Sequence, residues 1–148
     1  MENLKLKAIT FCDQGIFDKT EYQGLTKKKR IELISRSIEK SYENKYFEFF
    51  LLQNDSDIVG LMNFKAHSDT VISVAPEIKE EFRGKGFATA GLKLAYNLAK
   101  EKGFKIVIAD IREDNLPSIK LHEKLGFEYM RTYKNLKGTT LRLYLKLL

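Results

Sequence analysis

The chain contains few of the residues that cross-link small proteins or bind metal ions. Its 148 residues include one cysteine (Cys12), two histidines, two prolines and no tryptophan. A single cysteine excludes an intramolecular disulfide, and so few sulfur and imidazole ligands argue against a protein-built zinc site. We therefore expect no metal site. A chain of about 150 residues can be held together by one hydrophobic core without such cross-links.

Long apolar stretches are also missing. No run approaches the roughly 20 apolar residues that cross a bilayer. The first residues, Met1 to Lys5, do not form the apolar segment of a signal peptide. We therefore expect a cytoplasmic protein without a membrane segment.

Acidic residues are outnumbered by basic ones. The 26 lysines and arginines exceed the 20 aspartates and glutamates, which gives a net charge of +6. This excess favours anionic partners, and nucleic acid, an acidic protein and a phosphorylated cofactor all fit it. A charge that serves solubility alone fits equally well.

Hydrophobic periodicity in the first half of the chain predicts a strand, a helix and an antiparallel meander. Residues 4–10 alternate as a strand does, and residues 11–25 indicate a loop or short helix. Thr26 is placed to cap a helix that runs to about Asn44, with Ile31, Ile34, Ile38 and Tyr42 on its inner face. Three strands with short polar turns follow over 46–53, 58–66 and 71–79. Pro76 predicts a bulge, a splayed point or an edge in the last of them.

The second half predicts a crossover followed by a hairpin. A helix is expected over 88–102, with Gly91, Leu94, Ala95, Leu98 and Ala99 inside, and then a strand over 104–111. Strands joined through a helix in this way run parallel. A short helix over 117–125 and paired strands over 127–133 and 140–147 complete the chain. The predicted fold class is α+β: one domain over residues 1–148, in the order β-α-β-β-β-α-β-α-β-β.

A glycine-rich loop between a strand and a helix carries the chemical signal. In Arg83-Gly84-Lys85-Gly86-Phe87-Ala88, glycines let consecutive N–H groups face one concavity at a helix N-terminus. Arg83 and Lys85 add positive charge, so the loop predicts a phosphate or pyrophosphate site. A Walker A loop would need Lys-Ser/Thr after its last glycine, and a dinucleotide fingerprint would need a third glycine. Neither pattern is present, and a turn without a ligand is the structural alternative.

The loop resembles the acetyl-coenzyme A loop of the GNAT N-acetyltransferase superfamily. Arg83, Gly86 and Ala88 stand at the Arg-x-x-Gly-x-Ala spacing of that family. The segment from Asn115 to Leu125-Gly126-Phe127 is similar to its second signature, and the phosphinothricin-type and ribosomal-protein-type branches are nearest in motif. The predicted element order matches as well, with a central strand pair that splays apart in this fold.

The resemblance implies acetyl-coenzyme A as cofactor. Main-chain N–H groups of residues 84–89 would hold the pyrophosphate, and residues 78–79 would pair with the pantetheine arm like an added strand. Asn115 and Ser118 would lie beside that arm. The implied cofactor-binding residues are Ile78, Lys79, Arg83, Gly84, Lys85, Gly86, Phe87, Ala88, Thr89, Asn115 and Ser118.

Two residues are the leading catalytic candidates. His122 stands four residues before Gly126, where many relatives carry a tyrosine near the sulfur, and a histidine can donate a proton near neutral pH. Tyr129 and Tyr133 are alternative donors. Glu77, on the strand that leads into the loop, is the expected general base. Its rivals are Glu80, Glu81, Asp110 and a water molecule.

The resulting prediction is an N-acetyltransferase in which a primary amine attacks acetyl-coenzyme A directly in a ternary complex. The acceptor is a small molecule or a protein or peptide amine, and Glu21, Glu39 and Glu43 could attract a cationic one. A non-catalytic acyl-coenzyme A sensor is one alternative. A nucleic-acid-binding module that uses the basic run at 27–30 is another.

Three further expectations concern the surface. The apolar strand at 141–148 is either core or an edge that pairs in a dimer, so both a monomer and a homodimer fit the sequence. Cys12 is expected to be a buried apolar residue. The basic run at 27–30 is most simply a solvated helix end.

Overall fold

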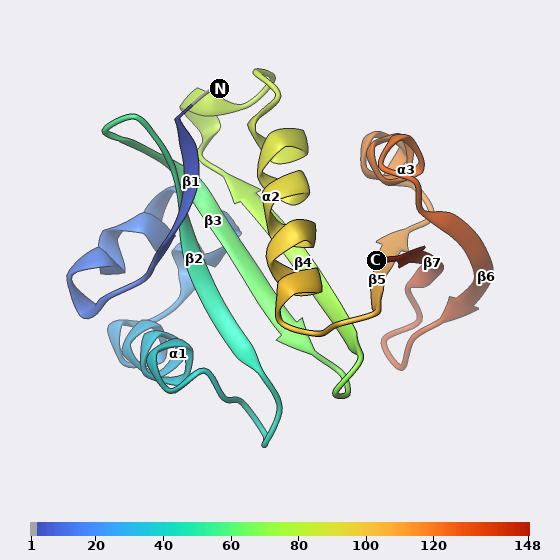
Figure 1. The fold of residues 1–148 in the computed structure, drawn as a ribbon, viewed down its shortest axis with the longest axis horizontal. Helices are drawn as coiled ribbons and strands as arrows, with labels where there is room; N and C mark the ends of the chain where they lie inside the picture. The colour runs from blue at the N-terminus through green and yellow to red at the C-terminus, as the bar shows by residue number, and fades with distance from the viewer. Residues whose placement is uncertain (1–2) are drawn as a thin grey trace.

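The structure is a computed structural model that describes residues 3–148, apart from the side chain of Lys19. The strands and α-helices follow the predicted order (Figure 1): β1 (Leu4–Ala8), α1 (Lys27–Glu39), β2 (Phe47–Asn54), β3 (Asp57–Ala66), β4 (Val71–Ile78), α2 (Phe87–Glu101), β5 (Ile106–Arg112), α3 (Leu116–Lys124), β6 (Glu128–Lys134) and β7 (Thr140–Leu147). Short 3-10 helices form η1 (Phe11–Lys19), η2 (Glu21–Gly24) and η3 (Glu80–Phe82). The predicted α+β class is confirmed.

The strands form one mixed sheet in the order β1-β2-β3-β4-β5-β7-β6. Neighbours are antiparallel except β4 and β5, which are parallel, as the crossover predicted. β4 and β5 pair only at Val71 with Ile106 and at Ile72 with Val107, and then diverge (Figure 1). The predicted splay is therefore present, and the main chain of β4 has an open edge beyond Ile72.

Pro76 lies on this open edge. The Val71 carbonyl accepts from the His67 N–H (2.8 Å), and the Lys79 N–H donates to the Val59 carbonyl (2.9 Å), so odd-numbered residues of β4 bond to β3. Main-chain groups alternate in direction along an antiparallel strand. Those of Pro76 and Ile78 therefore point away from β3, toward the side that β5 has left. Pro76 pairs with Met62 without a register break, and its missing N–H removes no hydrogen bond from the ladder.

The sheet is covered differently on its two faces. α2 packs on the face that carries Phe64, Ile72 and Val74, while α1 and η1 cover the face that carries Phe49 and Leu61. The predicted inner face of α2 is confirmed at three positions (Gly91, Ala95 and Ala99), and Leu92 and Tyr96 are also buried. A Cβ on Gly91 would lie 2.9 Å from the side chains of Leu52 and Met62, so α2 sits close to the sheet.

The prediction for α1 was wrong in its end and, at Ile31 and Ile38, in its inner face, whereas Ile34 is confirmed as buried. The helix stops at Glu39, because Lys40 adopts a left-handed conformation. Ile34 and Ser37 face the core, while Ile31 and Ile38 are 38% and 49% exposed. Ser37 sets this rotation, because its hydroxyl accepts a hydrogen bond from the Phe49 N–H (2.8 Å).

Arg30 does not belong to a basic patch. Its side chain is 12% exposed and pairs with Asp18 at 2.6 Å. It also donates to the carbonyl oxygens of Leu25 (3.2 Å) and Gln23 (3.1 Å). Arg30 therefore ties η1 and η2 to α1, and the basic run is divided between a structural arginine and three lysines at the surface.

The structure decides between the two alternatives for the last strand and corrects the expectation for Cys12. β7 is an inner strand and not an edge, because β6 pairs along its outer side and leaves β1 and β6 as the edges of the sheet. Cys12 is exposed rather than buried, because it lies on η1 while Ile16 and Phe17 of the same segment fill the core.

Candidate functional site

The N-terminus of α2 is built to receive an anion. Gly84 and Gly86 have φ angles of 74° and 85°, a region that side chains other than glycine rarely adopt. Gly86 is the N-cap of α2 and supplies no side-chain hydrogen bond, whereas Thr26 caps α1 and Asn115 caps α3. The first N–H groups of a helix have no partner within it and carry partial positive charge. The loop therefore fits a phosphate group.

The two basic residues of this loop are placed differently. The Lys85 Nζ lies 5.8 Å from the centre of the Phe82 ring, beside the exposed loop. Arg83 turns back, and its Nε donates to the Ile78 carbonyl oxygen at 3.0 Å. A Cβ on Gly84 would meet no atom within 4 Å, so the concavity has room. Lys85 is the side-chain cation at the loop, while Arg83 holds the end of β4.

A cavity of about 750 Å³ extends from the start of α2 to α3. Thr89 lines it from α2, and Pro117, Lys120 and Leu121 line it from α3. In Figure 1, α2 lies over β4, and α3 follows the end of β5 on the other side of the opening between these strands. A ligand anchored at the start of α2 thus has space to continue toward α3.

The predicted contacts at Ile78 and Lys79 are not equivalent. Ile78 directs its main-chain N–H and C=O toward the open edge, as an added strand would require. The Lys79 N–H already bonds to Val59, so it is not directed there. Phe87 is buried against Phe82 (6.0 Å between ring centres), and Ala88 is half-buried.

Asn115 and Ser118 organise the first turn of α3. The Asn115 Oδ1 accepts from the Ser118 N–H at 3.3 Å, which caps the helix. The Ser118 carbonyl oxygen in turn lies 2.7 Å from the His122 Nδ1. The three residues predicted on this helix are therefore connected to one another.

The His122 ring is neutral, and its one N–H is hydrogen-bonded. A carbonyl oxygen can only accept, so the Nδ1 carries the proton and the Nε2 is left as an acceptor. The residue is 7% exposed and packs edge-on against Phe127, with ring centres 4.9 Å apart. Burial lowers the pKa of His122 more than the Ser118 carbonyl raises it. In this state, the ring has no free proton to donate.

Glu77 lies in an acidic cavity of about 580 Å³ on the opposite face of the sheet from α2. The cavity is formed between η1 and η2 on one side and β4 and η3 on the other, and is lined by Asp18, Thr20, Glu21, Gln23, Glu77, Glu80, Glu81 and Arg83. The Glu77 Oε2 accepts from the Glu21 N–H at 3.4 Å. Burial and the negative charge of Glu21 raise the pKa of Glu77, and the Arg83 guanidinium partly offsets this.

The alternative catalytic candidates are paired elsewhere. The Tyr133 hydroxyl donates to the Asp110 Oδ1 at 2.5 Å, and this bond raises the pKa of Tyr133. The Tyr129 hydroxyl bonds to the Thr132 hydroxyl at 2.7 Å on β6. Glu80 and Glu81 share the cavity with Glu77, whereas Asp110 lies on β5.

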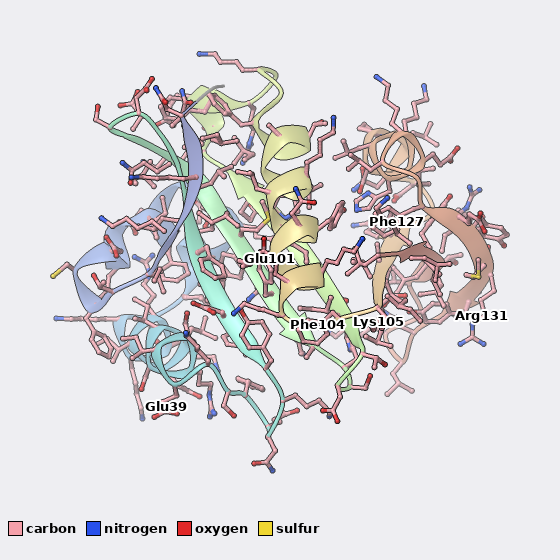
Figure 2. All side chains as sticks on the ribbon, viewed as in Figure 1. Glu39, Glu101, Phe104, Lys105, Phe127 and Arg131 are labelled. Carbon is pink, nitrogen blue, oxygen red and sulfur yellow. The ribbon has the colours of Figure 1, made fainter. Side chains whose placement is uncertain are left out.

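Sequence reasoning missed part of the acidic cavity. Of the three acids proposed to attract an amine, Glu21 lines it, but Glu39 and Glu43 do not. Figure 2 shows Glu39 at the end of α1 that lies far from the loop before α2. Asp18 was not singled out, because its approach to β4 is a contact across 59 positions of the chain that no local pattern signals.

Comparison with known proteins places the chain in a family. Residues 17–127, three quarters of the chain, match the model of the acetyltransferase (GNAT) family. A Bacillus subtilis protein named as an SPbeta prophage-derived uncharacterized N-acetyltransferase is 30% identical over 135 residues, which cover 85% of this chain and 76% of that protein. The chain belongs to the GNAT acetyltransferase family, as the two motifs predicted.

Solved structures share the fold. An N-acetyltransferase from Staphylococcus aureus matches with a TM-score of 0.75 and 22% identity over 98% of both chains. A ribosomal L7/L12 α-N-protein acetyltransferase in complex with coenzyme A matches with a TM-score of 0.81 and 13% identity, over 100% of this chain and 96% of that one. Within residues 3–148, none of the helices has the length and hydropathy needed to cross a membrane.

Proposed function

We propose that this protein is an acetyl-coenzyme A-dependent N-acetyltransferase in which a primary amine attacks the thioester directly. The observation that carries the proposal is the α2 N-terminus, which lacks a side-chain cap and follows two left-handed glycines. Acetyl-coenzyme A supplies the activated acetyl group in this family. The main-chain N–H groups at this loop suit the pyrophosphate of acetyl-coenzyme A.

Residues along the α2 side of β4 hold the cofactor. Main-chain N–H groups from Gly84 to Thr89 bind the pyrophosphate, with Lys85 close by. The N–H of Ile78 pairs with a carbonyl of the pantetheine arm on the open edge of β4, while the Ile78 C=O accepts from the Arg83 Nε. Asn115 and Ser118 border the arm from α3. Positioning of this kind can supply a large part of the rate enhancement.

The acidic cavity on the other side of β4 receives the acceptor. Its carboxylates suit an amine, which is cationic at neutral pH until it loses a proton. Glu77 accepts that proton directly or through a water molecule, because its raised pKa makes it a better base than an ordinary glutamate. His122 orders α3 through Ser118, and its Nε2 is an acceptor. A small-molecule amine and a peptide amine both fit these features.

Thermal unfolding with and without acetyl-coenzyme A tests the proposal. A ligand at about 100 times its Kd should add about 2.7 kcal/mol to the free energy of unfolding. A Gly86→Glu variant should lose this stabilisation, because the carboxylate repels the pyrophosphate and the left-handed φ resists a side chain.

The control is Gly103→Glu, at the other end of α2. Gly103 also has a positive φ (96°, against 85° at Gly86), so the backbone strain of a side chain there is similar. This variant should keep the acetyl-coenzyme A stabilisation. Absence of any stabilisation in the parent protein would refute the proposal.

A further inference from the structure

Tyr96 carries a buried hydroxyl that has no hydrogen-bond partner. The residue is 6% exposed, and its hydroxyl oxygen bonds to no atom of the described residues. Nearly all buried polar atoms in folded proteins are hydrogen-bonded, and leaving one without a partner is destabilising. The position calls for a partner that only a ligand or a water molecule could supply.

The Tyr96 side chain lies on the same face of α2 as Thr89, which lines the cavity toward α3. Tyr96 follows Thr89 by seven residues, which places both on one face of the helix. The Tyr96 ring packs against Phe127, with centres 5.7 Å apart, and Figure 2 shows Phe127 beside the end of α3. Long side chains on a helix lean toward its N-terminus, so the hydroxyl is expected on the side of Tyr96 that faces the glycine loop.

His122 lies against the same phenylalanine. The ring of Phe127 thus contacts two polar side chains, Tyr96 on α2 and His122 on α3. The His122 proton is bonded to the Ser118 carbonyl. Burial raises the pKa of Tyr96, so its O–H is intact at neutral pH. Of the two groups, Tyr96 is the one with a donor to offer.

We infer that the Tyr96 hydroxyl donates a hydrogen bond to the thioester-bearing end of the pantetheine arm. The inference rests on the proposed function, which anchors the pyrophosphate at Gly86 and runs the arm between α2 and α3. Tyr96 lies ten residues along the helix, about 15 Å at 1.5 Å per residue. Its backward lean brings the hydroxyl nearer to the loop, within reach of an extended arm.

The test compares Tyr96→Phe with the parent protein by thermal unfolding and by titration calorimetry. Without ligand the variant should be as stable as the parent or more stable, because it removes an unpartnered buried hydroxyl. Its affinity for acetyl-coenzyme A should fall about 3- to 10-fold, the usual effect of one lost hydrogen bond. Its affinity for adenosine 3′,5′-bisphosphate, which lacks the arm, should not change.

Tyr46→Phe is the matched control. The Tyr46 hydroxyl bonds to the Glu48 Oε1 at 2.6 Å, so this variant should lose stability and keep its affinity for acetyl-coenzyme A. Equal affinity of Tyr96→Phe and the parent for acetyl-coenzyme A would overturn the inference and leave the proposed function standing. A parent protein that binds neither ligand would overturn both.

Discussion

The end of β4 separates two surfaces of opposite character. On the α2 side lie the left-handed glycines, the uncapped helix and Lys85, all suited to an anion. On the η1 and η2 side, Glu77 lies among other carboxylates in the acidic cavity. Under the proposed function, β4 presents its main chain to the cofactor and the Glu77 side chain to the acceptor. The two ligands would then meet where β4 and β5 stop pairing.

The comparison shows how one strand can border two surfaces of opposite charge. The Glu77 side chain points to the face opposite α2, whereas the Ile78 main chain points to the open edge, so in the proposed function these adjacent residues serve different ligands. The divergence of β4 from β5 then opens a route between the faces. Variants on each side should therefore affect different measurements.

The largest effect is expected from Glu77→Gln, which removes a carboxylate from the acidic cavity and leaves the cofactor side unchanged. Loss of the general base should lower kcat by about 100-fold or more. The affinity for acetyl-coenzyme A should stay unchanged, because Glu77 faces away from α2. Steady-state kinetics with a reactive amine, together with calorimetry, would measure both quantities.

Glu80→Gln is the control for this variant, since Glu80 lines the same cavity without contacting the η2 main chain in the way that Glu77 does. It should retain most of the activity. A Glu77→Gln enzyme with parental kcat would assign proton removal to water or to another group.

The pH dependence of the rate and of the stability also tests the role of Glu77. Glu77 must be ionised to accept a proton, so the rate of the parent should fall as pH drops through its raised pKa. The raised pKa also means that the folded protein holds this proton more tightly than the unfolded chain. The stability that Glu77 contributes is therefore full at acidic pH and is lost as pH rises through the folded pKa. Glu77→Gln should lack this decline, which begins as the pH rises above the ordinary glutamate pKa of about 4.3.

A smaller effect, on both the acidic cavity and the cofactor side of β4, is expected from Gly60→Ala. A Cβ on Gly60 would lie 2.2 Å from the Glu77 carbonyl oxygen and 3.0 Å from the Ile78 Cα. The end of β4 would have to move, at a loss of about 1–3 kcal/mol in the free energy of unfolding. Both kcat and the affinity for acetyl-coenzyme A should fall, as urea unfolding and kinetics would show.

Gly15→Ala serves for comparison, because a Cβ at Gly15 meets nothing within 4 Å. It should change neither stability nor affinity appreciably. If Gly60→Ala unfolded at the same urea concentration as the parent, the close approach of β3 to β4 would be disproved.

The smallest effect is expected from Asn115→Ala, on the α3 side of the cofactor cavity. Removing this cap should lower the free energy of unfolding by about 1 kcal/mol. The affinity for acetyl-coenzyme A should fall only slightly if Asn115 acts by ordering α3. Thr26→Ala, which removes the α1 cap, should lose similar stability and no affinity. A large loss of affinity in Asn115→Ala alone would indicate a direct contact with the ligand.

Local patterns predicted the elements well and the faces of some helices poorly. Alternation and turn chemistry are local, so the meander, the crossover and the terminal hairpin were recognised from single segments. The inner face of α1 was recognised at Ile34 but not at Ser37, because a hydrogen bond from the Phe49 N–H of β2 to the Ser37 hydroxyl outweighs the burial of Ile31 and Ile38. The placement of Cys12 failed for a similar reason, since neighbouring apolar residues fill the core.

In the candidate site too, local features could be predicted from the sequence, whereas features that depend on distant contacts could not. The sequence by itself determined the glycine loop, the cap at Thr26 and the family motifs, because these depend on φ angles and hydrogen bonds within a few residues. Only the tertiary structure decided on which side of β4 each group lies, that Glu21 approaches Glu77, and that the Tyr96 hydroxyl has no partner among residues 3–148. These features arise from contacts between distant segments, and packing of the whole sheet sets them.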